Sequence, residues 1–239
     1  MAIELDGIRV TTTMRTPGHD YELASGFCFT EGLLGGASVV EVRYCATGSA
    51  VETEFNVVTV STGGVAPAAQ PRLGTTTSSC GLCGSASLDD LAGRVTALCA
   101  RDLARFDFDL IETMPARALV GQDLFEATGA VHAAAAFRLD GSIAVTREDV
   151  GRHNAVDKVV GRLLLDGALP AGHLALFVSG RASFEIVQKA WAAGFGTLVA
   201  VSAPTALAVE SARRAGMTLA GFVRPGRMNV YSPEQLPRP

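Results

Sequence analysis

Helix-type and strand-type segments alternate through the second half of the chain, and this alternation restricts the fold more than any other feature. Between residues 156 and 164, apolar side chains repeat at the i, i+3, i+4 spacing of one helix face, and Gly167 ends that helix. Short apolar runs typical of buried strands follow, separated by helix-type segments that begin near Ser183 and Pro204. The expected strands cover residues 174–178, 197–201, 218–223 and 228–231. Such alternation predicts an α/β layer of mostly parallel strands joined by right-handed crossovers.

The first half of the chain mixes strand and helix signals without this regular alternation. Residues 5–13 have strand composition. The segment after Asp20, the expected N-cap, has helical spacing and ends at Gly35-Gly36. Residues 39–45 and 51–61 again have strand composition. These signals predict a smaller α+β unit ahead of the α/β layer.

The segment that joins the two halves carries a proline and a hairpin signal. Pro115 suits the first turn of a helix that is expected to run to about Ala127. Residues 129–139 predict a helical turn followed by a strand. Asp140-Gly141 indicates a tight turn, and the alternation over 143–147 predicts the returning strand of a hairpin.

The composition excludes several classes of protein. Of the 239 residues, 48% are hydrophobic and 18% are charged, so the chain can form a substantial core and is not disordered throughout. The net charge of −4 argues against a non-specific nucleic-acid binder, which would be basic. No apolar run reaches the roughly 18–20 residues that span a bilayer, and no signal peptide is visible. We therefore expect a cytoplasmic protein with reduced thiols and with neither nucleic-acid nor membrane partners.

Two cysteines, Cys80 and Cys83, lie in a run of small and polar residues from Thr75 to Ser85 that has no hydrophobic period. Thiols at this spacing can form a disulfide, supply half of a zinc site, or pass sulfur to another molecule. A structural zinc site needs four ligands, and a deaminase-type site needs an upstream His-x-Glu motif that this chain lacks. A thioredoxin-like pair needs a strand directly ahead of it, which is missing here. The pattern therefore favours a thiolate that exchanges sulfur between two partners, and we expect no bound metal.

The other three cysteines, Cys28, Cys45 and Cys99, are isolated in segments of regular periodicity. We expect all three to be buried as small apolar residues. The odd total of five cysteines argues against a disulfide framework.

Basic residues gather in the loops beside the expected strands and helices. The candidates are Arg152, His153, Arg181, Arg224 and Arg227. Because loops at the carboxyl ends of the strands of an open α/β sheet face one crevice, we expect these side chains to share an edge. Guanidinium groups and helix N-termini both favour phosphate, so a phosphorylated or nucleotide-bearing ligand is indicated without any G-x-G-x-x-G or Walker motif. The residue types leave it open whether His153 is a base or a helix cap, and whether Glu148 and Asp149 orient it or bridge to the arginines.

These residues together resemble the FdhD family of formate dehydrogenase accessory sulfurtransferases. The similarity spans nearly the whole chain, and its most specific parts are the segment Ser78-Ser79-Cys80-Gly81-Leu82-Cys83-Gly84 and the run from Arg147 to Lys158. Further matching segments cover residues 14–20, 26–32, 128–134, 179–185, 202–205 and 224–231.

The resemblance implies a sulfurtransferase of the carrier type. A cysteine desulfurase would load a persulfide onto the first cysteine of the pair, Cys80, with Cys83 as helper. The sulfur would then pass to the molybdenum (or tungsten) bis(guanine dinucleotide) cofactor destined for formate dehydrogenase, and GDP is expected to mimic that cofactor. The cofactor-binding stretch of the family corresponds here to Phe222, Val223, Arg224, Pro225, Gly226 and Arg227, with Arg152, His153 and Arg181 expected beside it.

The resemblance also implies the fold and assembly. A cytidine-deaminase-like α/β layer domain is expected over residues 100–239 and a smaller N-terminal α+β domain over 1–75, with the flexible C-x-x-C loop and its connection over 76–99. The protein is expected to form a homodimer. Relative to the family, an N-terminal segment is expected to be short or absent. Ser85 replaces a usual Lys, which removes a cation that could lower the thiol pKa of Cys80.

Two alternatives stay open beside the sulfur carrier. One is a non-catalytic chaperone that binds and delivers the cofactor, for which the thiols are dispensable. The other is a metal-dependent hydrolase related to the deaminases.

Overall fold

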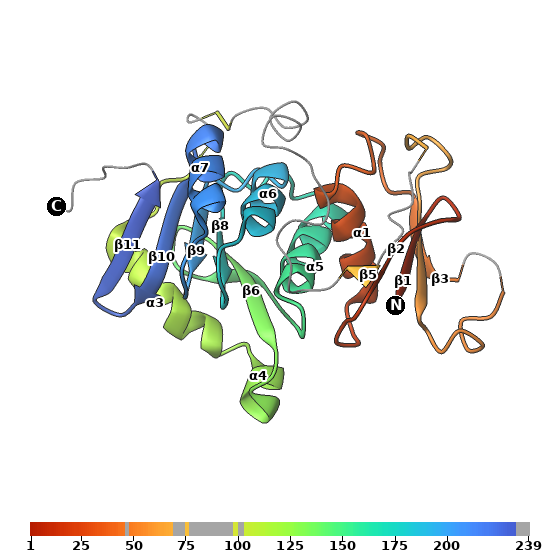
Figure 1. Cartoon of the computed structure of the whole chain (residues 1–239), viewed down its shortest axis with the longest axis horizontal. Helices are drawn as coiled ribbons and strands as arrows, with labels where there is room; N and C mark the ends of the chain where they lie inside the picture. The colour runs from red at the N-terminus through yellow and green to blue at the C-terminus, as the bar shows by residue number, and fades with distance from the viewer. Residues whose placement is uncertain (46–47, 69–74, 77–97, 100–102, 233–239) are drawn as a thin grey trace.

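The structure is a computed structural model that describes residues 1–45, 48–68, 75–76, 98–99 and 103–232 of the 239-residue chain. Within these ranges the chain forms two β-sheets, with helices packed between them and around the larger one (Figure 1). The predicted mixed α/β class is confirmed. No helix among the described residues is long and apolar enough to cross a bilayer.

The larger sheet has six strands in the order β11-β10-β9-β8-β6-β7. Its strands are β6 (His132–Phe137), β7 (Ile143–Asp149), β8 (Ala175–Val178), β9 (Thr197–Ala200), β10 (Thr218–Arg224) and β11 (Arg227–Ser232). The central strands β8, β9 and β10 run parallel, as the alternation predicts, and β6, β7 and β11 pair antiparallel with their neighbours. The predicted hairpin at Asp140-Gly141 joins β6 to β7, with Gly141 in the left-handed region at φ 79°.

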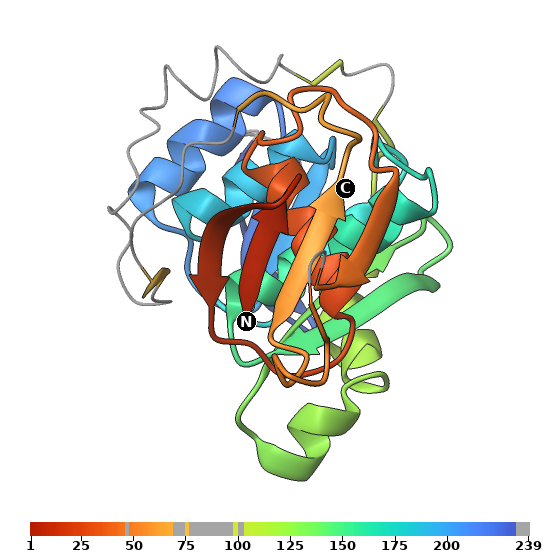
Figure 2. The same cartoon turned by 90° about the vertical axis from the view of Figure 1, so that its right-hand side faces the viewer.

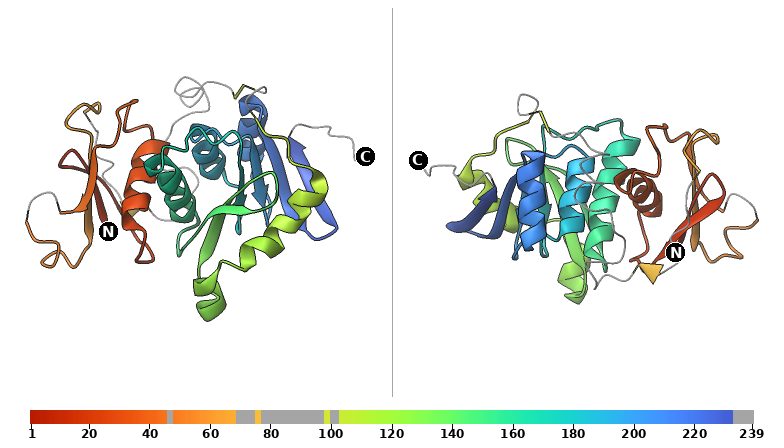
Figure 3. Two further views of the ribbon diagram at one scale, coloured as in Figure 1. Left: turned by 180° about the vertical axis from the view of Figure 1, so that it is seen from behind. Right: turned by 45° about the horizontal axis from the view of Figure 1, so that its top comes forward.

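Helices cover both faces of the larger sheet. On one face lie α5 (Arg152–Leu165), α6 (Phe184–Ala192) and α7 (Ala206–Ala215), side by side in the right-hand view of Figure 3. Their apolar faces pack on strand side chains such as Leu176 and Leu198, both fully buried. On the other face lies α3 (Phe108–Leu119), seen in front of the strands in the left-hand view of Figure 3. The sheet therefore has a core on each side, although α3 covers only part of its face.

Pro115 lies inside α3 and not in a first turn, so the predicted helix from Pro115 to Ala127 is wrong. The chain instead ends α3 at Leu119 and forms a separate short helix, α4 (Asp123–Thr128). Pro115 cannot donate a backbone hydrogen bond to the carbonyl of Ile111, which weakens the helix locally. Ile111 and Met114 are buried against the sheet, and this tertiary packing holds the helix across the proline.

The smaller sheet has five strands in the order β3-β4-β1-β2-β5 (Figure 2). Its strands are β1 (Ala2–Leu5), β2 (Ile8–Thr13), β3 (Glu41–Tyr44), β4 (Val57–Ser61) and β5 (Thr75–Thr76). The single strand predicted over residues 5–13 is wrong, because the chain turns at Asp6 and Gly7 to pair β1 with β2. Both turn residues have positive φ, 48° and 83°, which is the signature of a type I′ hairpin.

Helix α1 (Asp20–Thr30) lies between the smaller sheet and α5 (Figure 1). Its N-cap is His19, in the left-handed region, and not the predicted Asp20. The carboxylate of Asp20 instead accepts hydrogen bonds from Arg15 and Tyr44, at 2.9 and 3.0 Å. The side chain of Asp20 therefore links the helix to the smaller sheet.

The backbones of α1 and α5 approach each other through two glycines. A Cβ atom added to Gly26 would fall on the carbonyl oxygen of Asp157, and one added to Gly161 would fall on the carbonyl oxygen of Glu22. No flexible side chain is available to move aside at either point. The contact that joins the smaller sheet's helix to the larger unit therefore requires glycine at both positions.

Replacing Gly161 with Ala is expected to lower the free energy of unfolding by about 1–3 kcal/mol, although alanine favours helices, because the added methyl group forces the helices apart. Urea denaturation followed by circular dichroism measures the change. Gly121→Ala is the matched control, since its Cβ would meet only ordinary contacts at 3.6 Å. Equal stability of the two variants would show that the α1–α5 contact tolerates a side chain.

The predicted division into residues 1–75, 76–99 and 100–239 has its boundaries beside segments outside the described ranges, and it stays a prediction. The cytidine-deaminase-like arrangement of layers likewise stays a prediction of the resemblance.

Candidate functional site

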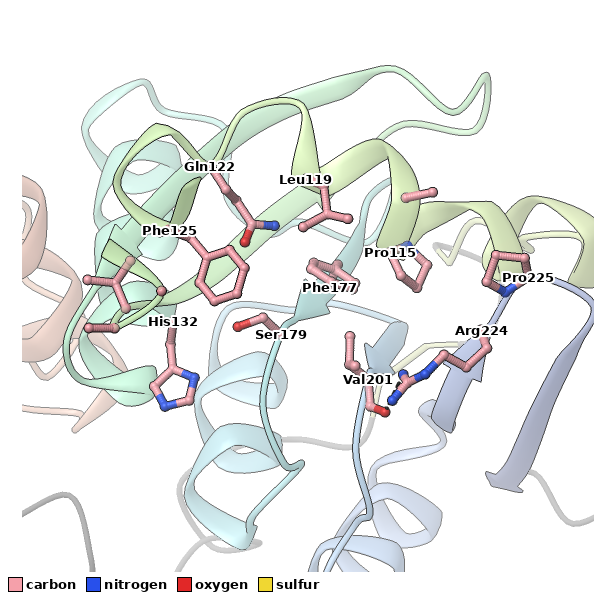
Figure 4. Close-up of a pocket in the computed structure, with 14 residues that line it drawn as sticks. Pro115, Leu119, Gln122, Phe125, His132, Phe177, Ser179, Val201, Arg224 and Pro225 are labelled. Carbon is pink, nitrogen blue, oxygen red and sulfur yellow. Dashed lines mark hydrogen bonds between the residues drawn. The ribbon is translucent and has the colours of Figure 1, made fainter. Parts of the chain in front are cut away.

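The carboxyl ends of the three parallel strands meet at one edge of the larger sheet, as predicted. Each strand contributes a residue to a pocket of about 610 Å³ there: Ser179 follows β8, Val201 follows β9, and Arg224 ends β10 (Figure 4). Pro225 and Gly226 then form the turn into β11, with Gly226 at φ 77° as a tight turn after proline requires. The pocket is therefore built on rigid strand ends.

The opposite wall of the pocket comes from α3, α4 and the start of β6. The pocket-lining residues from these segments are Pro115, Ala116, Leu119, Gln122, Phe125, Gly129, Ala130, Val131 and His132, and Phe177 of β8 completes the set. Sequence reasoning missed this wall. Its residues are ordinary helix and loop residues, and no local pattern shows that α3 lies across the sheet edge.

Arg224 is held by its own loop. Its Nη1 donates hydrogen bonds to the carbonyl oxygens of Val201 and Val223, at 2.8 and 2.9 Å, although the residue as a whole is exposed. These bonds join the ends of β9 and β10 and fix the guanidinium at the pocket. Arg227 is exposed at the start of β11, where it pairs with Arg224 across the turn, but it does not line the pocket.

The rest of the predicted stretch from Phe222 to Arg227 divides between core and surface. Val223 is fully buried beneath α3, in the same cluster as Met114. Phe222 is 44% exposed and has a positive φ of 53°, which is rare for an aromatic residue. Its backbone N–H donates to the carbonyl of Ser202. The aromatic ring of Phe222 is therefore partly exposed at the end of β10.

Arg152 and Arg181 form a second basic group on this edge. Arg152 begins α5, and Arg181 follows β8. Burial and then the charge of Arg181 lower the pKa of Arg152. A Cβ on Gly180 would lie 3.5 Å from Nδ1 of His132 and 3.7 Å from Cδ of Arg152. His132 and Arg224 lie at opposite ends of the pocket (Figure 4), and the side chain of Arg152 lies near Gly180, as His132 does.

His153 lies apart from the pocket lining. Its Nε2 is 3.3 Å from the hydroxyl of Ser183 and 3.9 Å from the carboxylate of Glu185. Burial, followed by the charges of Lys189 and Arg152, lowers the pKa of His153 to about 4. The imidazole is therefore neutral at pH 7 and does not act as a cation toward phosphate. Ser183 holds the predicted N-cap position of α6, but its side chain makes no capping hydrogen bond.

We expect the His153 imidazole to titrate with a midpoint near pH 4 in NMR spectra, because its folded pKa lies below the ordinary 6.5. Because the folded state binds a proton less readily than the unfolded state, the free energy of unfolding is highest above pH 6.5. It decreases as the pH falls from 6.5 toward 4. Each unit by which the pKa differs between the folded and unfolded states corresponds to about 1.4 kcal/mol of that free energy. A His153→Asn variant should lose this part of the pH dependence of unfolding. A titration midpoint of His153 near pH 6.5 would contradict the conclusion that this imidazole is buried.

The acidic residues before Arg152 hold the fold together. Glu148 accepts hydrogen bonds from the backbone N–H groups of Leu124 and Phe125, at 2.9 and 2.8 Å, and so fixes α4 against β7. Asp149 is fully buried and lies 2.8 Å from the ammonium group of Lys158. In the described part of the chain, the hydrogen bonds and ion pairs of these two carboxylates go to other groups and not to His153. Glu148 positions a wall of the pocket, and Asp149 ties β7 to α5.

Arg147 and Asn154 connect the two sheets. Arg147 donates to the carboxylate of Glu22 on α1, at 2.7 Å between Nη2 and Oε1. Asn154 donates to Asp149 and to the carbonyl of Met14, at 2.9 and 2.7 Å. Arg147 and Asn154 therefore serve packing, whereas the candidate Arg152 lies near the pocket residue His132.

Cys80 and Cys83 lie outside the described residues. Of the other cysteines, Cys28 and Cys45 are buried as predicted, and burial raises the pKa of the Cys28 thiol to about 12, which makes it unreactive. The prediction for Cys99 is wrong, because Cys99 is exposed. Cys99 lies in a short described stretch without regular structure, so no helix or strand buries it. In the described part of the chain, no three His, Cys, Asp or Glu side chains converge as metal ligands.

Comparison with known proteins gives a consistent picture over the whole chain. The model of the FdhD/NarQ family matches residues 1–236. The chain is 49% identical to the sulfur carrier protein FdhD of Streptomyces avermitilis over 243 residues, which cover 98% of this chain and 85% of that protein. It is 45% identical to the protein of the same name from Nocardia farcinica, over 97% of this chain and 84% of that protein.

A solved structure is also similar. The crystal structure of a formate dehydrogenase accessory protein from Desulfotalea psychrophila superimposes with a TM-score of 0.74 at 27% sequence identity. The superposition covers 98% of this chain and 86% of that one. Both sheets and their connecting helices thus have counterparts in a protein of related sequence.

Proposed function

Because the chain belongs to the FdhD/NarQ family, we propose that it is a sulfur carrier that acts in the maturation of formate dehydrogenase. The observation that carries the proposal is the Cys80-x-x-Cys83 pair in a chain whose curated relatives are named sulfur carrier proteins. The similar solved structure, described as a formate dehydrogenase accessory protein, supports the same role. The reduced thiols that the chemistry needs fit a cytoplasmic location.

In the proposed reaction, the Cys80 thiolate attacks the outer sulfur of a persulfide on a cysteine desulfurase. The sulfur–sulfur bond of the desulfurase breaks, its cysteine leaves as a thiolate, and Cys80 then carries the persulfide. Delivery uses Cys83, whose thiolate attacks the inner sulfur of that persulfide. A Cys80–Cys83 disulfide forms and hydrosulfide is released to the acceptor, so the two electrons come from the thiols. A cellular dithiol then reduces the disulfide and restores the carrier.

The proposed acceptor is the molybdenum bis(guanine dinucleotide) cofactor, held at the carboxyl edge of the larger sheet. Arg224 at one end of the pocket and Arg152 with Arg181 near the other supply cationic groups for its diphosphates. Arg227 and Phe222 extend the same edge, and GDP serves as a mimic of half of the cofactor. A homodimer would offer two such edges to the two dinucleotides.

The chaperone alternative is supported by one observation: among the described residues, those that line the pocket include Arg224 and no cysteine. Maturation of formate dehydrogenase separates the two functions. With wild-type protein, a cysteine desulfurase and cysteine, inactive formate dehydrogenase is expected to gain formate oxidation. We expect Cys80→Ser to abolish this gain, because no other thiol replaces the persulfide carrier.

Cys99→Ser is the matched control for that experiment, since Cys99 is an exposed cysteine outside the pair. It should support maturation as well as wild type. Full maturation by the Cys80→Ser protein would contradict sulfur transfer and favour the chaperone.

A further inference from the structure

The short helix α4 stands out from the body of the molecule (Figure 1, Figure 2), and none of its six residues is buried. The end of α3 and this helix together expose four large apolar side chains within seven positions. They are Leu119, Val120, Leu124 and Phe125, which are 56%, 86%, 41% and 40% exposed. We call these four residues the α4 surface. Large apolar side chains that gather on the outside of a folded protein mark a contact with a partner.

Hydrogen bonds hold α4 in place although none of its side chains is buried. A helix of six residues is not stable in water by itself. In its first turn, the carboxylate of Glu148 on β7 accepts hydrogen bonds from the backbone N–H groups of Leu124 and Phe125, at 2.9 and 2.8 Å. At its other end, Gly129 has a left-handed φ of 64° and donates its N–H to the carbonyl of Phe125 at 2.7 Å. The α4 surface is therefore rigid before it binds, which reduces the entropy lost on binding.

The charged side chains around the α4 surface are acidic. Asp123 and Glu126 are exposed beside Leu124 and Phe125. The sequence contains no Lys, Arg or His over residues 119–131. An apolar centre with a polar rim is the usual composition of a protein–protein interface. The acidic rim matches a partner whose surface is basic around an apolar groove.

The α4 surface adjoins the pocket at the carboxyl edge of the larger sheet. Leu119 and Phe125 line that pocket and are also exposed (Figure 4). Val120 and Leu124 are not among the described residues that line it. A protein that covers the α4 surface therefore also lies against the pocket. This position suits a partner that receives what the pocket holds, because the transfer then takes place without release into solvent.

We propose that the α4 surface docks on formate dehydrogenase that has not yet received its cofactor, at the rim of the empty cofactor cleft. The inference rests on the proposed function, which makes that enzyme the recipient. A cleft that binds the diphosphates of a dinucleotide presents cationic side chains, and these complement Asp123 and Glu126. A bound cofactor neutralises the cleft, so docking should favour the empty enzyme over the loaded one.

Biolayer interferometry with immobilised formate dehydrogenase and the full chain tests the proposal. Wild type is expected to bind the cofactor-free enzyme about 10-fold more tightly than the loaded enzyme, or better. The double variant Val120→Ser with Leu124→Ser should weaken this binding about 10- to 100-fold, because it removes apolar contacts from the centre of the interface. Both residues are exposed, so the melting temperature should stay near that of wild type.

A second variant tests the acidic rim. Asp123→Asn with Glu126→Gln removes two charges and keeps the shape of the side chains. Its association rate should fall about 3- to 10-fold at low salt and approach that of wild type near 0.5 M salt, where exposed charges are screened.

Val40→Ser with Leu165→Ser is the matched control. It also replaces one exposed valine and one exposed leucine, which are 72% and 44% exposed and lie before β3 and at the end of α5. Binding of this variant to the cofactor-free enzyme should equal that of wild type.

Four results would overturn the proposal. Two of them are wild-type affinity in a folded Val120→Ser, Leu124→Ser protein and no binding by wild type. The third is a change of oligomeric state in that variant, measured by sedimentation velocity, because the α4 surface would then join two copies of the chain. The fourth is loss of persulfide loading in that variant, which would assign the surface to the desulfurase.

Failure of this inference and failure of the proposed function give different results. Persulfide loading of Cys80, together with wild-type binding by the Val120→Ser, Leu124→Ser protein, would remove the docking site and leave the carrier. Docking that depends on the α4 surface, in a protein that never accepts a persulfide, would remove the carrier and leave the docking site.

Discussion

Replacing Lys189 with Met is expected to lower the free energy of unfolding by about 3–5 kcal/mol, because it leaves buried carboxylates without their cation. The Lys189 ammonium group lies 2.9 and 3.0 Å from the carboxylate oxygens of Asp157 and 3.0 Å from Glu31. It also donates to the hydroxyl of Thr30 at 3.0 Å. The side chains of Lys189 and Asp157 are 5% and 2% exposed. This cluster joins α6 and α5, which pack on the larger sheet, to α1, which packs on the smaller sheet. Its loss therefore weakens the contact between the two sheets and their helices.

The loss of stability in Lys189→Met should depend on pH. Burial raises the pKa of Asp157 to about 6 even with Lys189 present, and removing that cation raises it further. A carboxyl whose pKa is higher in the folded state than the unfolded value of 3.8 is buried at little cost while it is protonated. The free energy of unfolding falls as the pH rises through the folded pKa and the carboxyl ionises. The deficit should therefore be largest at neutral pH and smaller near pH 4.

Urea denaturation at pH 7 and pH 4 measures both effects, with the slope m checked for equality among variants. Arg162→Met is the control, since Arg162 is 47% exposed and its surface ion pair with Asp166 should contribute less than about 1 kcal/mol. The double variant Lys189→Met with Asp157→Leu should recover part of the loss, because it removes the cation and the nearer carboxylate together. A Lys189→Met protein within about 1 kcal/mol of wild type at pH 7 would refute this account of the cluster.

The larger sheet could be predicted from the sequence because its signals are local. Apolar spacing over α5, the apolar runs of β8 and β9, and the Asp140-Gly141 turn each determine a structure within a few residues. The same turn chemistry is present at Asp6-Gly7, inside a segment whose composition predicts a single strand. Reading that dipeptide as a type I′ turn would have given the β1–β2 hairpin.

The site could be predicted only in part. The edge that carries Arg181 and Arg224 follows from strand order, since parallel strands end on one side. The wall that carries Gln122 and Phe125 depends on where α3 crosses the sheet, which is a tertiary contact without a local signal. Pro115 also misled the prediction, because proline usually lies in the first turn of a helix. In α3 it lies in the interior of the helix, where packing against the sheet stabilises the helix across it.

The run from Arg147 to Lys158 shows why a specific motif is not always a ligand site. Its charged residues were natural candidates for binding an anion. In the fold, Asp149 pairs with Lys158 beneath the surface, and Arg147 binds Glu22 across the two units. Buried charges need partners, so a dense charged segment next to a buried helix serves packing as readily as binding.

Persulfide formation on Cys80 is the second large effect that we expect, and it is all-or-none. After incubation with a cysteine desulfurase and cysteine, the intact mass of wild-type protein should rise by about 32 Da, the mass of one sulfur atom, and a reducing agent should reverse the gain. Cys80→Ser should show no gain, because the nucleophilic thiolate is absent. Cys83→Ser should load sulfur but release it poorly, since the attacking thiol for delivery is missing. Cys99→Ser, with its exposed thiol removed, should behave as wild type.

This intact-mass measurement tests the sulfur-carrier account most directly, because it detects the transferred atom itself. A reducible gain of one sulfur in wild type and Cys99→Ser, absent from Cys80→Ser, is the result that the account predicts. No gain in wild type with an active desulfurase, or an equal gain in Cys80→Ser, would contradict it.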